Sequence, residues 1–155
     1  MRTWHAALAL VILMAGAGAW AQSSNDRSIE IDKAWARISP SEPDTLSIFF
    51  DVTSKGDVPD TLRFATSPIA GKVLLRRGRW EGLNFHNDQA IGVPIKAHRL
   101  TSFRPGVLEV TLKELNAPTI VGETVTVRLH FSRAGEITIT PTISNQLLGN
   151  RFRKN

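Results

Sequence analysis

The feature that most constrains this chain is a series of short segments in which apolar and polar residues alternate. Residues 107–112 place Leu108, Val110 and Leu112 on one face, and residues 124–131 alternate in the same way. Because successive side chains of a strand point to opposite faces, this period of two is typical of strands buried on one side. No stretch shows a convincing helical period of about 3.6 residues. The sequence therefore predicts an all-β fold.

Turn signals separate these segments. Arg104-Pro105-Gly106 is a turn leading into residues 107–112, and Gly82 is a turn residue within residues 80–85. Segments with strand character also occur at residues 29–38, 45–52, 61–67, 72–75, 91–95, 99–103 and 136–143. Short strands at regular spacing predict a cupredoxin-like or immunoglobulin-like antiparallel β-sandwich of about eight strands.

Residues 1–21 have the composition of a bacterial export signal. Arg2 is the positive residue, residues 6–15 form a short apolar run, and residues 19–21 fit the small-x-small rule for cleavage. About ten apolar residues are too few to span a bilayer, which takes about 20. We expect cleavage after Ala21 and a periplasmic or otherwise exported protein; an uncleaved membrane anchor is the alternative.

The remaining chain is short enough for one domain. We expect a flexible polar spacer at residues 22–27, the β-sandwich domain at residues 28–146 and a basic tail at residues 147–155. Internal repeats are absent from the sequence, so nothing suggests a solenoid or a propeller.

The chain contains no cysteine, and both of its methionines, Met1 and Met14, lie in the predicted leader. The exported protein is therefore expected to have no disulfide, no thiolate nucleophile and no soft sulfur ligand for a metal. The sequence also lacks G-x-S-x-G, H-E-x-x-H, P-loop and G-x-G-x-x-G motifs. These absences argue against an enzyme.

The formal net charge is +5, and loss of Arg2 with the leader reduces it to +4. Behind an export signal this charge favours a solvated basic surface, or attraction to anionic lipid or an acidic partner, over nucleic-acid binding. Any membrane contact is expected to be peripheral. Arg76, Arg77 and Arg79 beside Trp80 form a candidate partner patch for a carboxylate, a phosphate or an acidic protein. The alternative is a solvated hairpin whose tryptophan covers an open sheet edge.

A series of short motifs occurs in a characteristic order between residues 28 and 143. They are Ala34-Trp35-Ala36-Arg37, Gly56-Asp57-Val58-Pro59-Asp60, Ser67-Pro68-Ile69-Ala70, Ala97-His98, Pro105-Gly106, Gly122-Glu123-Thr124-Val125 and Ala134-Gly135-Glu136. In this order the motifs resemble the PCuAC family of periplasmic copper chaperones. The resemblance implies a cupredoxin-like sandwich, copper as the bound metal and a role in copper delivery to cytochrome oxidase assembly.

The residues at the copper-ligand positions implied by this resemblance differ from those of the family. The family's first His falls at Arg76, its hairpin Met near Leu83 or Phe85, and its His-x-Met pair at Glu109 and Thr111. Cu(I) prefers thioether and imidazole ligands, which none of these residues offers. We therefore expect a degenerate metal site and no bound cofactor, with copper implied by the resemblance alone. Arg76 and Glu109 are predicted to form an ion pair where the family holds its metal.

Two functions follow from these observations. The first is an exported PCuAC-like domain that acts as a periplasmic binding or protein-interaction module, with an unidentified protein of copper handling or oxidase assembly as its partner. The alternative is a metal chaperone that uses the non-standard ligands His86, His98 and Glu109 as a nitrogen and oxygen site for zinc or copper(II). These histidines can equally be unrelated surface residues.

Overall fold

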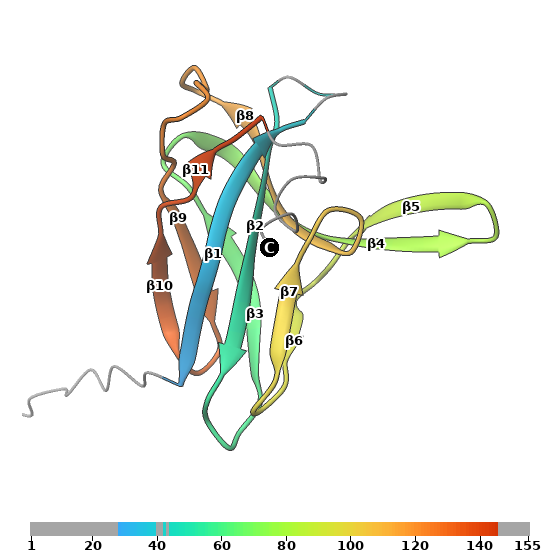
Figure 1. The fold of residues 1–155 in the computed structure, drawn as a ribbon, viewed down its shortest axis with the longest axis vertical. Coiled ribbons are helices and arrows are strands. Elements are labelled where there is room, and N and C mark those ends of the chain that lie inside the picture. The colour runs from blue at the N-terminus through green and yellow to red at the C-terminus, as the bar shows by residue number, and fades with distance from the viewer. Residues whose placement is uncertain (1–27, 40–41, 43, 146–155) are drawn as a thin grey trace, which may run out of the picture.

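The computed structural model describes residues 28–39, 42 and 44–145, which form two packed β-sheets (Figure 1). The predicted all-β sandwich is confirmed. The strands are β1 Ile29–Ile38, β2 Leu46–Ser54, β3 Asp60–Thr66, β4 Ala70–Glu81, β5 Asn84–Gln89, β6 Val93–Ile95, β7 Leu100–Phe103, β8 Leu108–Leu115, β9 Val127–Phe131, β10 Gly135–Ile139 and β11 Thr142–Ile143. The predicted leader, spacer and basic tail lie outside the described residues.

The larger sheet has the strand order β11-β1-β2-β8-β4-β5, and β7 pairs with one end of β2. The smaller sheet has the order β10-β9-β3-β6. β11 runs parallel to β1, whereas the other paired strands are antiparallel. Within the described ranges no helix is long and apolar enough to cross a bilayer.

The core lies between the inner faces of the two sheets. Leu108, Val110 and Leu112 of β8 belong to it, as their alternation predicts. Phe50 of β2 stacks on Phe103 of β7 with ring centroids 4.3 Å apart. These side chains bury the apolar stripe of each strand, which is the main favourable contribution to folding.

Three strand boundaries differ from the sequence expectation. The segments predicted at 72–75 and 80–85 belong to one hairpin, in which β4 continues through Arg76 to Glu81 because it pairs with β8 on one side and β5 on the other. Residues 124–126 do not join β9, and Thr124 forms only an isolated bridge to Thr142. The segment predicted at 136–143 is split into β10 and β11, which pair with different sheets.

The β4–β5 hairpin extends away from the sandwich (Figure 1). β4 pairs with β8 as far as Arg77, opposite Leu108, and beyond this point it pairs only with β5. The hairpin closes through the two residues Gly82 and Leu83, with Gly82 at a φ of +61°. We refer to residues 79–86 as the arm.

Candidate functional site

The pairing of β4 with β8 brings together three of the residues at the copper positions implied by the resemblance. Arg76 lies directly opposite Glu109, and Thr111 lies opposite Leu74 on the same strand pair. Leu75 and Val110 point into the core, so their neighbours Arg76, Glu109 and Thr111 point to the outer face by alternation. These three residues are therefore neighbours on one surface of the larger sheet.

A hydrogen-bonded chain links these residues through Asn87 of β5. The Nη2 of Arg76 donates to the backbone carbonyl of Asn87 at 2.7 Å, and the Nδ2 of Asn87 donates to Oε1 of Glu109 at 2.7 Å. The hydroxyl of Thr111 donates to the same Glu109 oxygen at 3.4 Å. We call Arg76, Asn87, Glu109 and Thr111 the polar cluster. The two bonds of Asn87 are short and charge-assisted, since one has a guanidinium donor and the other a carboxylate acceptor.

The predicted ion pair between Arg76 and Glu109 does not form a direct contact. The salt bridges found among the described residues do not include this pair. The prediction placed the two residues correctly opposite each other but missed Asn87, whose backbone carbonyl accepts a bond from Arg76 and whose side-chain amide donates one to Glu109. The Nε of Arg76 is buried and has no hydrogen-bond partner among the residues that the structure describes.

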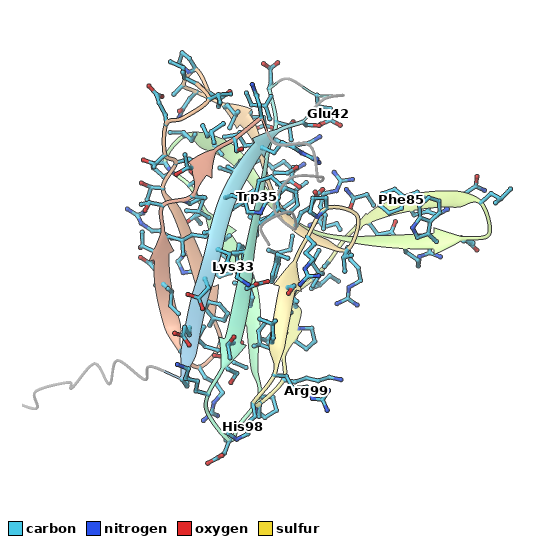
Figure 2. The ribbon with its side chains drawn as sticks, viewed as in Figure 1. Lys33, Trp35, Glu42, Phe85, His98 and Arg99 are labelled. Carbon is cyan, nitrogen blue, oxygen red and sulfur yellow. The ribbon has the colours of Figure 1, made fainter. Side chains whose placement is uncertain are left out.

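The fourth position does not join the polar cluster. Figure 2 shows Phe85 on the arm. It lies opposite Trp80, and the centroids of the two rings are 5.2 Å apart. Leu83, the other residue proposed for this position, is in the turn and is fully exposed. The side chains at this position therefore face solvent at the arm.

The structure does not bring His86, His98 and Glu109 together. His98 lies near the turn between β6 and β7 (Figure 2), where its Nε2 contacts Oδ1 of Asp57 at 2.8 Å. Glu109 instead bonds to Asn87. His86 lies on the arm, with its Nε2 3.6 Å from Oε2 of Glu81. In the part of the chain that the structure describes, no group of three or more His, Cys, Asp or Glu side chains could hold a metal ion. The separation arises because β7 pairs with β2, away from the β4–β8 ladder.

The predicted patch of Arg76, Arg77, Arg79 and Trp80 is divided between two faces of the hairpin. Alternation places Arg77 and Arg79 on one face, and Arg76 and Trp80 on the other. Arg79 pairs with Glu81 at 3.1 Å and with Asp88 at 3.3 Å. The arginines therefore do not present one continuous basic surface.

Two residues of this region had no signal in the sequence. Asn87 and Gly78 both fall outside the segments for which the sequence predicts strands, yet they lie in β5 and β4. Both are placed by cross-strand register, since Gly78 lies opposite Asn87 and donates its N–H to the carbonyl of Val107 at 2.9 Å. Only the pairing of distant segments reveals their roles.

Lys113 continues the outer face of β8 beyond Thr111 and holds a carboxylate. Its Nζ lies 2.6 Å from Oε2 of Glu42. The hydrogen bond from Lys113 is the main cause that lowers the pKa of Glu42, and a second hydrogen bond from Thr45 adds to it. Because the pKa is lower in the folded state, this interaction stabilises the fold above the unfolded pKa and is lost as the pH falls through the folded pKa.

Replacing Lys113 with methionine is expected to raise the pKa of Glu42 towards the ordinary glutamate range. The replacement removes both the hydrogen bond and the positive charge that favour the ionised carboxylate. Carboxyl carbon shifts followed by NMR during a pH titration measure this change. Lys72→Met is the control, because Lys72 lies directly opposite Lys113 on β4 and does not contribute to the pKa of Glu42. An unchanged Glu42 titration in Lys113→Met would contradict the assignment.

Comparison with known proteins places this geometry in a family. Residues 29–143 match the LpqE-like family, whose description names a lipoprotein. No curated protein matches the chain.

Solved structures of PCuAC domains share the fold. The apo PCuAC domain from PmoF1 has a TM-score of 0.66 and 21% identity, and covers 77% of this chain and 95% of that one. The copper-bound PCuAC domain from PmoF2 has a TM-score of 0.65 and 20% identity over 77% and 94% of the two chains. The solution structure of CuI-DR1885 from Deinococcus radiodurans has a TM-score of 0.62 and 21% identity over 82% and 87%. The predicted PCuAC-like sandwich is confirmed.

Proposed function

Because the chain belongs to the LpqE-like family and has the PCuAC fold, we propose that it is an exported binding module that has kept the scaffold of a copper chaperone without its Cu(I) site. The observation that carries the proposal is the polar cluster, which fills three of the implied ligand positions with Arg76, Glu109 and Thr111. The arm, which projects from the sandwich beside this cluster, is the proposed contact surface. The partner named by the family resemblance is a protein of copper handling or oxidase assembly.

The chemistry of the polar cluster opposes binding of Cu(I). The described residues contain neither cysteine nor methionine, so the thioether and thiolate ligands that Cu(I) prefers are missing from them. Oε1 of Glu109 already accepts bonds from Asn87 and Thr111. A cation about 4 Å from the Arg76 charge would be repelled by about 4 kcal/mol at an effective dielectric constant near 20, which is roughly a thousandfold in affinity.

Restoring the family's donors is expected to create a Cu(I) site. The variant Arg76→His, Glu109→His and Thr111→Met removes the fixed charge and adds two imidazoles and one thioether at the three positions that the structure brings together. Competition against a Cu(I) chelator should give affinity at least roughly a thousandfold higher than that of the native chain. The control Arg77→His, Asn84→Met and Asp88→His adds the same donor types on the opposite face of the hairpin and should not match this gain.

A Cu(I) titration of the native protein can overturn the proposal that the Cu(I) site is absent. Native protein that binds Cu(I) with submicromolar affinity, and loses it in Glu109→Ala, would overturn the assignment. The alternative chaperone with His86, His98 and Glu109 is tested in the same titration with copper(II) and zinc. This alternative predicts tight copper(II) or zinc binding that disappears in His86→Ala or His98→Ala. The structure gives the alternative no support, because His86, His98 and Glu109 each contact a different residue.

Export is supported by the lipoprotein description of the family. The finer location in the periplasm, with cleavage after Ala21, remains part of this proposal. These 155 residues contain no cysteine, so no thioether-linked lipid can be attached within them.

A further inference from the structure

The arm is an amphipathic ribbon with large apolar side chains in solvent. Trp80 is 68% exposed, Phe85 43% and Leu83, in the turn between them, 97%. Trp80 and Phe85 lie opposite each other and therefore share one face. None of these three side chains belongs to the hydrophobic core. Their exposed apolar surface is therefore available for contact with a partner.

The other face of the arm is polar and its charges largely neutralise one another. Arg79 contacts Glu81 and Asp88, and His86 lies 3.6 Å from Glu81. An acidic peptide would have to compete with these internal carboxylates for Arg79. An apolar and polar face on one ribbon, with aromatic rings on the apolar side, is the pattern of side chains that settle at a membrane–water interface.

The backbone holds the arm away from the sandwich. The N–H of Gly78 bonds to the carbonyl of Val107 at 2.9 Å, and β4 runs without a break from the larger sheet into the arm. Figure 1 shows the β4–β5 hairpin extending well beyond the two sheets. A flat surface can therefore meet Leu83 and its aromatic neighbours without a clash with the body of the domain.

We propose that the arm inserts Trp80, Leu83 and Phe85 into the interface of an anionic bilayer. This inference rests on the proposed binding module and names the partner of its arm. Three apolar side chains alone give weak binding, as a single acyl chain does, so a second attraction is needed. The net charge of +4 that remains after loss of Arg2 with the leader supplies that attraction for anionic headgroups. The association is consequently reversible, dependent on anionic lipid and weakened by salt.

Flotation with vesicles tests this anchoring. Protein recovered after export is mixed with vesicles of phosphatidylglycerol and phosphatidylethanolamine, or of phosphatidylcholine alone. Native protein should float with the anionic vesicles, less so at high salt. Trp80→Ser, Leu83→Ser and Phe85→Ser combined should lower the partition coefficient at least about tenfold. Leu83→Ser alone should lower it measurably, and its exposed position leaves folding intact.

The matched control is Ile120→Ser with Val121→Ser. Both residues are exposed apolar side chains in the segment between β8 and β9, outside the arm. This variant should float as the native protein does. Equal flotation of the arm variant and the control variant would overturn the inference, and so would failure of native protein to bind anionic vesicles.

Failure of the membrane proposal is separable from failure of the binding module. A photo-crosslinker at position 80 reports proteins that contact the arm. If the native protein crosslinks to another protein but does not bind vesicles, the membrane inference is wrong and the arm is a protein-binding surface. The Cu(I) titration tests the absence of a metal site independently of either result.

Discussion

Replacement of Asp60 by alanine is expected to lower the free energy of unfolding by about 2–4 kcal/mol. Asp60 is buried, and its carboxylate accepts three backbone N–H bonds, from Thr61 at 2.6 Å, Arg133 at 3.0 Å and Ala134 at 2.9 Å. These bonds join the start of β3 to the turn between β9 and β10. Alanine would remove the acceptor of all three partly buried N–H bonds at once, which costs more than the loss of one exposed bond. Urea unfolding followed by circular dichroism measures the change.

The matched control is Asp57→Ala, three residues earlier in the loop that leads into β3. The side chain of Asp57 is 95% exposed and contacts His98 at the surface. Its removal should change stability by less than about 0.5 kcal/mol, as is usual for surface substitutions. Similar losses in the two variants would show that the buried carboxylate does not hold the β9–β10 turn.

Replacement of Gly78 by alanine is expected to displace the arm. A Cβ at this position would collide with the carbonyl oxygen of Gly106 and lie 2.6 Å from the carbonyl carbon, with an edge of Phe85 at 2.9 Å. The clash is with backbone, which cannot move aside as the end of a side chain can. We expect a loss of about 1–3 kcal/mol, typical of overpacking, and weakened protection of the Gly78 N–H. Hydrogen exchange across residues 78–89 together with urea unfolding measures both effects.

Gly71→Ala is the control for this prediction, because Gly71 lies in the same strand. A Cβ at position 71 would lie 2.9 Å from Oε2 of Glu114, the flexible end of a side chain. Glu114 can move, so arm protection should stay native in this variant. Native hydrogen exchange in Gly78→Ala would contradict the close crossing of β4 over the Pro105-Gly106 turn.

The arm and the polar cluster depend on the same local geometry. Gly78 follows Arg76 on the outer face of β4 and pairs with Asn87, so a shift of the arm also disturbs the bond from Asn87 to Glu109. The positions to which the resemblance assigns copper ligands lie at a junction that orients the hairpin. Under the proposed function, the same hydrogen bonds exclude Cu(I) and set the direction in which Trp80 and Phe85 point.

The sequence could predict the local features of the fold. The alternation of Leu108, Val110 and Leu112 identified the core face of β8, because side chains alternate along any strand. Pro105 and Gly106 identified the turn, in which Gly106 has a φ of +76° and the N–H of Val107 bonds to the carbonyl of Arg104 at 3.0 Å. The motif order identified the family fold, which the matching family and structures confirm.

Pattern alone could not predict which outer-face residues are covered. Alternation assigned Thr111 to the polar side of its strand, yet its side chain is buried. Thr111 lies between Ser47 of β2 and Leu74 of β4, so neighbours from both sides cover it. Such burial depends on the strands that flank β8 and leaves no periodic signal within β8 itself.

By itself, the sequence determined the β-sandwich, the turn at Pro105-Gly106 and the lack of sulfur ligands beyond the predicted leader. These properties follow from the alternation, the backbone preferences and the composition of the chain. Only the tertiary structure decided that Asn87 stands between Arg76 and Glu109, and that Trp80 and Phe85 share a face from which Arg77 and Arg79 point away. These contacts join strands that are far apart in sequence or paired across a hairpin, so they are set by strand register and not by the local pattern of any one segment.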